Sequence, residues 1–185
     1  AGGAAVAFGL NKRSILNDIN TNVINLYNVV RSEHFHELYN MVNELKTQGH
    51  DVLEATFYVA RDYINQSEEY GLERAFYYIV QRQLCFSGME RYNSDGLFNV
   101  PFGHYKSFSC NLSPIHHEFL KECKLYEKSF EELDYSNEDA FYFIDPPYLN
   151  RLGYGTESET LHELLAITLA DCKGKWLLIH TDCEF

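Results

Sequence analysis

The stretch FYFIDPPYLN, residues 141–150, places four apolar or aromatic residues directly before an aspartate, two prolines and a tyrosine. A continuous apolar run of this length predicts a strand that is buried on both faces of a parallel sheet. Proline has no N–H, so Pro146 and Pro147 end the strand and leave carbonyls without a local donor. Ligands of such sheets bind at the carboxyl ends of the strands, which makes Asp145 and Tyr148 candidate functional residues.

The D-P-P-Y tetrapeptide combines hydrogen-bond acceptors with an aromatic face. A carboxylate and free carbonyls suit a planar group that donates hydrogen bonds, namely an exocyclic amine. The ring of Tyr148 offers a surface on which a base can stack. Two acceptors that hold the amine hydrogens out of plane would localise its lone pair and aim it at an electrophile. A simple strand-ending turn is the alternative, and the position after a buried strand favours a functional site.

The rest of the chain alternates between helical and strand-like patterns. Apolar residues at helical spacing predict helices over 23–45, 51–64, 72–84, a stretch from 113 onward, and 158–171. A second buried strand is predicted over 175–180, while glycines and short aromatic pieces over 86–112 predict loops and a hairpin. This alternation with one irregular insert predicts an α/β fold, doubly wound.

The beginning of the chain carries a second set of ligand-suited residues. Gly2 and Gly3 form a turn that lets a backbone approach a ligand closely. Asp18 ends the strand-like segment ILND, where a carboxylate can accept both ribose hydroxyls of a nucleotide-like ligand. A plain tight turn is the alternative for the glycines. The G-x-G-x-x-G and P-loop patterns are both absent from the sequence.

Composition and charge narrow the function further. The chain has 185 residues, a net charge of −12 and five cysteines without a C-x-x-C pair, so neither a disulfide framework nor a structural zinc site is expected. His and Glu near residues 33–37 lack the spacing of a metal site, and we expect no metal. Basic residues outnumber acidic ones only in 73–128, so any phosphate contact is expected there. No membrane span or signal peptide is recognisable, which predicts a cytoplasmic protein.

Three motifs resemble those of one enzyme family. They are AGGAAV with LNDIN near the start, CFSGMERYNSDGLFNVPFGHYK in the middle and FIDPPYLN towards the end. Their content and order are similar to the Dam-type, D12-class adenine-specific DNA methyltransferases. The resemblance implies a Rossmann-like, doubly wound sheet, S-adenosylmethionine as the methyl donor, and methylation of the 6-amino group of adenine in double-stranded DNA. The implied setting is a bacterium, phage or virus, and we expect a monomer.

The resemblance also implies roles for individual residues. Residues 1–50 and 129–185 would form the catalytic and cofactor-binding domain, truncated at both ends, and 51–128 the inserted target-recognition region. The cofactor-binding residues would be Gly2, Gly3, Asp18 and Asp145, and the catalytic ones Asp145, Pro146, Pro147 and Tyr148. The DNA-binding residues would be Phe86, which inserts into the duplex, and Met89, Arg91, Asn93, Pro101 and Lys106.

Other functions remain open at this stage. The matching recognition residues make GATC the first expected target, with the adenine flipped into the D-P-P-Y pocket. Methylation of another amine, on RNA, cytosine or protein, is the main alternative among enzymes. A sequence-reading DNA-binding module without catalysis and an interaction protein on an α/β scaffold are the alternatives from other classes.

Overall fold

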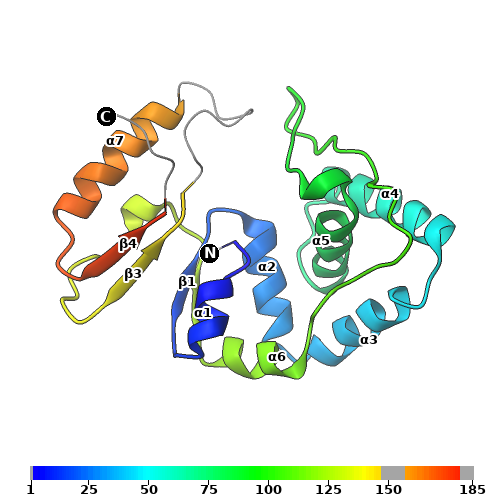
Figure 1. Ribbon diagram of the computed structural model, residues 1–185, viewed down its shortest axis with the longest axis horizontal. Helices are drawn as coiled ribbons and strands as arrows, with labels where there is room; N and C mark the ends of the chain where they lie inside the picture. The colour runs from blue at the N-terminus through cyan, green and yellow to red at the C-terminus, as the bar shows by residue number, and fades with distance from the viewer. Residues whose placement is uncertain (1, 147–156, 180–185) are drawn as a thin grey trace. The chain divides into compact units, whose positions relative to one another are not determined.

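The computed structural model describes residues 2–146 and 157–179, with the backbone alone for 157–160 (Figure 1). The chain divides into two compact units, Ala1–Glu127 and Lys128–Phe185, and each is described by itself. Together the described elements make a mixed α/β protein. Among the described residues no helix has the length and apolarity that crossing a membrane requires.

The first unit contains one short parallel pair of strands and most of the helices. Its elements in chain order are α1 (Ala5–Leu10), β1 (Ile15–Asn17), α2 (Thr21–Val30), α3 (Phe35–Leu45), α4 (His50–Gln66), α5 (Leu72–Leu84), the 3-10 turn η1 (Phe86–Gly88), α6 (Pro114–Lys121) and β2 (Lys124–Tyr126). Strands β1 and β2 run parallel, with Leu16 opposite Leu125. The helices over 72–84 and after Ser113 begin where the sequence predicts them.

Helix α5 lies at the centre of the first unit, where it packs against α2, α3 and α4. Its apolar stripe meets those of the neighbouring helices, which is the arrangement expected for amphipathic helices around one core. The fully buried side chains of this core include Leu38, Val42, Leu53, Phe57, Ala60, Ala75 and Val80. This core supports the hairpin that follows α5, because the hairpin contributes Phe98, Val100 and Phe102 to the same cluster.

The single helix predicted over 23–45 is wrong, because the chain breaks between α2 and α3. Ser32 causes the break: its hydroxyl donates to the Val29 carbonyl at 2.8 Å and accepts from the His34 N–H at 3.1 Å. Serine side chains compete in this way with the backbone bonds of a helix. The apolar stripe continues on both sides of the break, which is why the periodicity alone did not reveal it.

The second unit contains the 3-10 turn η2 (Phe130–Glu132), β3 (Phe141–Ile144), α7 (Glu157–Ala170) and β4 (Lys175–Leu178). Strands β3 and β4 pair in parallel, with Ile144 opposite Leu178. The prediction that both strands are buried on both faces is wrong, since Phe141 is 58% exposed and Trp176 46%. Each strand has a single neighbouring strand among the described residues, and the adjacent residues Trp176 and Leu177, which point to opposite faces, are both about half exposed.

The described strand pairs test the predicted doubly wound sheet only in part. Both described sheets are parallel and have two strands each, β1–β2 and β3–β4. Parallel pairs joined through helices are typical of α/β folds. A single doubly wound sheet, and the division into a catalytic domain and an inserted recognition region, stay predictions.

Candidate functional site

The glycine turn and Asp18, far apart in the sequence, meet in the first unit. The Gly2 N–H donates to Asp18 Oδ2 at 2.7 Å, and the Asn20 N–H donates to Asp18 Oδ1 at 2.9 Å. Gly2 has a φ of +48°, a left-handed conformation that glycine adopts without strain. Asp18 follows β1 directly, so its carboxylate stands at the end of that strand and closes the turn before α1.

The electrostatics of this turn favour an ionised Asp18. Burial opposes the charge, the hydrogen bonds from the N–H groups of Gly2 and Asn20 favour it, and the pKa of Asp18 lies below its usual value. Burial, together with the negative charge of Asp18, raises the pKa of Tyr27. The Tyr27 hydroxyl therefore stays protonated and donates to the Gly2 carbonyl. A carboxylate is thus maintained beside an exposed glycine backbone.

Two contributors to this turn were missed in the sequence. Asn20 caps helix α2, since its side chain accepts from the Asn22 N–H at 3.0 Å. An asparagine just before a helical period is a recognised N-cap signal and could have identified it. Tyr27 lies on the apolar stripe of α2, where an aromatic residue predicts core packing, and no sequence signal distinguishes its hydroxyl contact.

The D-P-P-Y segment belongs to the second unit, and its description stops at Pro146. Asp145 directly follows β3 and is exposed. The parallel register continues past the strand, because the Ile179 N–H donates to the Ile144 carbonyl at 2.9 Å. Asp145 therefore stands at the carboxyl end of a parallel strand, as predicted. Pro147 and Tyr148 lie outside the described residues.

The segment after α5 forms the predicted hairpin. Antiparallel bridges join Cys85 to Phe102 and Tyr92 to Phe98. The turn is closed by Asn93, whose side-chain oxygen accepts from the N–H groups of Asp95 and Leu97 at 3.0 and 2.8 Å. Asn93 was predicted to bind DNA, and the structure gives its oxygen a role in shaping the turn.

The other predicted DNA-binding residues of this region are all exposed. These residues are Phe86, Met89, Arg91, Pro101 and Lys106. Arg91 is oriented by a residue that the sequence analysis missed: its Nε donates to Asn99 Oδ1 at 2.7 Å and its Nη2 to the Asn99 carbonyl at 3.2 Å. The guanidinium thus keeps its Nη1 edge for an outside partner.

An ion pair ties the start of the hairpin to the end of α5. Arg82 Nη1 lies 3.3 Å from Glu90 Oε2, and the Arg82 guanidinium also donates to the carbonyls of Gly88 and Met89. The Tyr92 hydroxyl donates to Glu90 Oε1 at 2.8 Å. Burial and then the charge of Glu90 raise the pKa of Tyr92. Arg82 is therefore bound by groups of the protein itself, and it contacts the backbone on either side of Met89.

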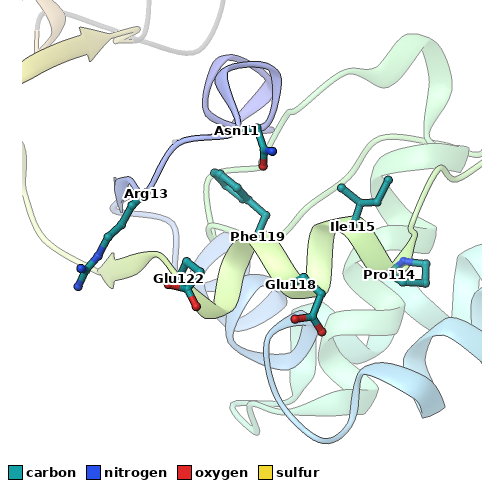
Figure 2. Close-up of a pocket in the computed structure, with 7 residues that line it drawn as sticks. All are labelled: Asn11, Arg13, Pro114, Ile115, Glu118, Phe119 and Glu122. Carbon is teal, nitrogen blue, oxygen red and sulfur yellow. The ribbon is translucent and has the colours of Figure 1, made fainter.

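An open groove of about 490 Å³ lies elsewhere on the first unit. Figure 2 shows its lining side chains, which come from α6, from the residue after it and from the segment that joins α1 to β1. They are Asn11, Arg13, Pro114, Ile115, Glu118, Phe119 and Glu122. None of these is a predicted site residue.

Metal ligands and thiols are two further kinds of reactive group in the part of the chain that the structure describes. No group of three or more His, Cys, Asp or Glu side chains there is placed to hold a metal ion. Burial raises the pKa of the thiols of Cys85, Cys110 and Cys123, which disfavours the nucleophilic thiolate.

Comparison with known proteins decides the family. A family model for the D12 class N6 adenine-specific DNA methyltransferases matches residues 1–185. The chain belongs to this family. The predicted resemblance is therefore confirmed over the whole chain.

Individual relatives agree with this assignment. The chain is 31% identical to the Type II methyltransferase M.CviBI of Paramecium bursaria Chlorella virus NC1A, over 100% of this chain and 72% of the relative. It is 30% identical to the Type II methyltransferase M.MjaIII of Methanocaldococcus jannaschii, over 80% of this chain and 56% of the relative. It is 31% identical to the DNA adenine methylase of Escherichia coli K12, over 82% of this chain and 56% of that protein. The chain thus spans about half to three quarters of these relatives.

Proposed function

We propose that this chain acts as a site-specific DNA methyltransferase that transfers a methyl group from S-adenosylmethionine to the 6-amino group of adenine in duplex DNA. The observation that carries the proposal is the exposed hairpin with Arg91 held in place by Asn99. An arginine presented in this way suits the O6 and N7 acceptors of guanine in the major groove. The family match gives the chemistry to which this recognition is coupled.

The residues of the glycine turn fit the methyl donor S-adenosylmethionine. Asp18 is held ionised beside an exposed backbone, and a Cβ built on Gly3 would meet no atom within 4 Å. A carboxylate of this kind accepts ribose hydroxyls, and an open glycine backbone admits a ligand closely. We assign Gly2, Gly3, Asp18 and Asp145 to the cofactor, which supplies an electrophilic methyl group when bound. No metal is required for this transfer.

The amine of the target adenine is the group on which the D-P-P-Y segment acts. The Asp145 carboxylate and the Pro146 carbonyl accept its two hydrogens, which localises the nitrogen lone pair. Adenine must leave the duplex to reach these acceptors, so base flipping is part of the proposal. Pro147 shapes the turn and Tyr148 stacks on the flipped base, and both assignments rest on the sequence.

The proposed DNA target rests on the hairpin after α5. From the resemblance of this segment to the family's recognition hairpin, we assign Met89, Arg91 and Pro101 to base reading, and GATC is the proposed target. Phe86 is half exposed at the start of the hairpin, and we assign it to insertion into the duplex. Lys106 and Asn93 complete the proposed DNA contacts. We further propose that the protein is cytoplasmic and monomeric. We also propose that its fold is Rossmann-like and doubly wound.

The test is methyl transfer by the natural full-length protein. Labelled S-adenosylmethionine is incubated with duplexes that contain GATC or the same bases in scrambled order, and with an Asp145→Ala variant as control. Label in GATC duplexes alone, lost in the variant, is the expected result. Binding to GATC without transfer to any nucleic acid would instead identify a DNA-binding module.

A further inference from the structure

We propose that Asn65 is the positioning residue that fixes the recognition hairpin and so sets the direction of its reading side chains. The proposal deepens the proposed function and rests on it. Asn65 lies near the end of α4, and its carboxamide pairs with both backbone polar groups of Phe98. Its Nδ2 donates to the Phe98 carbonyl at 3.0 Å, and its Oδ1 accepts from the Phe98 N–H at 2.9 Å. One side chain thus pairs with this residue as a neighbouring strand would.

The hairpin needs such support because it has few bonds of its own. Two antiparallel β-bridges are described between its arms. An isolated two-stranded hairpin is only marginally stable in water. Its returning arm alternates between buried and more exposed side chains, as a half-buried strand does. The buried ones are Phe98, Val100 and Phe102, with Phe98 only 2% exposed. Figure 1 shows the green segment after α5 projecting away from the helices, and Phe98 directly follows the turn that Asn93 and Leu97 close.

Phe98, the residue that Asn65 holds, lies close to Arg91 on one arm of the hairpin and to Asn99 on the other. Phe98 is bridged to Tyr92, which follows Arg91 in the chain. Phe98 also precedes Asn99, which holds the Arg91 guanidinium. A shift of the Phe98 backbone therefore moves both ends of the Arg91–Asn99 contact. Bidentate recognition of guanine depends on the direction of the guanidinium, so such a shift reduces discrimination.

The end of α4 is itself held firmly, which makes it a suitable support. The buried Arg74 guanidinium donates to the carbonyls of Ile64 and Ser67, on either side of Asn65. Its Nε donates to Asn22 Oδ1 on α2 at 2.6 Å. A cation at the carboxyl end of a helix is also favoured by the helix dipole. Asn65 thus projects from a helix end that is bound to a second helix of the core.

A purely structural role for Asn65 makes a different prediction. If the clamp only stabilised the fold, its loss would lower thermal stability and leave the preference between DNA sequences unchanged. If it positions the hairpin, its loss changes recognition more than it changes catalysis or cofactor binding, because Gly2 and Asp18 contact neither Asn65 nor Phe98 in any described hydrogen bond. Functional groups lose precision when their supporting residues are removed.

The test compares Asn65→Ala and Asn65→Asp with Asn40→Ala, an exposed asparagine of α3. Methyl transfer is measured with a cognate duplex and with duplexes changed at one base pair of the target. For both Asn65 variants we expect the KM for DNA to rise and the ratio of cognate to changed-site transfer to fall, each by about 10-fold. The kcat at saturating DNA and the Kd for S-adenosylmethionine should stay within about twofold, and Asn40→Ala should match the wild type. An unchanged ratio in Asn65→Ala would overturn the proposal.

Amide hydrogen exchange separates this proposal from the proposed function. In Asn65→Ala the amides of residues 91–99 should exchange faster, while those of α2 and α3 keep their protection. Unchanged exchange over 91–99 would overturn the clamp even if the wild type methylates DNA. Faster exchange there, in a protein that methylates no duplex, would support the clamp and refute the proposed function.

Discussion

The glycine turn and the recognition hairpin solve the same problem in different ways. Both are irregular segments that must present polar groups to a ligand. In the turn, Asp18 is at once the support and the proposed ligand group, because its carboxylate binds the Gly2 and Asn20 N–H groups. In the hairpin the two tasks are divided: Phe98 is buried as an anchor, while Arg91 is exposed as a reader. Substitutions should therefore couple stability to ligand binding in the turn and separate them in the hairpin.

The largest effect is expected from removing the hairpin anchor. Phe98→Ala deletes a side chain that is 2% exposed, and we expect a loss of about 3–5 kcal/mol in the free energy of unfolding. Phe86→Ala, which truncates a ring that is 50% exposed, is the matched control and should stay within about 0.5 kcal/mol of the wild type. Urea unfolding measures both. Equal losses in the two variants would contradict the division between anchor and reader.

The next effect tests the coupling in the turn. Asp18→Ala leaves the Gly2 and Asn20 N–H groups without their acceptor, which should cost about 1–3 kcal/mol of stability. The same variant should lose affinity for S-adenosylmethionine, measured by isothermal titration calorimetry. Asp62→Ala, on the exposed surface of α4, is the control for a removed carboxylate. Full cofactor affinity in Asp18→Ala would break the proposed double role.

Removing the Arg91 side chain should weaken DNA binding and leave the stability of the protein nearly unchanged. Arg91→Ala is expected to weaken binding to the cognate duplex by about 1–3 kcal/mol and to relax discrimination at one base pair. Its thermal stability should change little, because Arg91 is exposed and bonded only to Asn99 among the described contacts. Fluorescence anisotropy against cognate and changed duplexes provides the measurement. A large drop in stability would show that reader and anchor are not separate.

The smallest expected effect is the pH dependence of the stability that Asp18 contributes. The pKa of Asp18 is lower in the folded protein than in the unfolded chain, so its contribution to stability is complete above the unfolded value of about 4. That contribution is lost as the pH falls through the lower folded value. The stability difference between wild type and Asp18→Asn should thus be constant from about pH 7 to pH 5 and shrink below about pH 4. A difference that grows on acidification would contradict the assigned cause.

The sequence predicted local structure and the places of the ligand groups better than it predicted side-chain partners. Strand 141–144 and the helix over 72–84 are strong patterns that the structure confirms, as is the hairpin after residue 85. The break at Ser32 was missed because a side-chain bond to the backbone leaves the apolar period intact.

Prediction from the sequence has the same limit at the candidate site. Asp18 and Gly2 were expected at one ligand site from their strand-end and turn positions, and they are hydrogen-bonded. Asn65, Asn99 and Tyr27 were not expected, because each acts through a contact between residues distant in the sequence or through a neighbouring strand. Polar residues of this kind carry no periodic signal, so only the folded arrangement reveals them.

Identification of the methylated product tests the central claim most directly. The full-length protein is incubated with S-adenosylmethionine and a duplex that contains one GATC site, and the DNA is digested to nucleosides for mass spectrometry. The account predicts N6-methyldeoxyadenosine from this duplex, none from a duplex with the site scrambled, and none with Asp145→Ala. Methylation of cytosine, or a product that forms equally with Asp145→Ala, would contradict it.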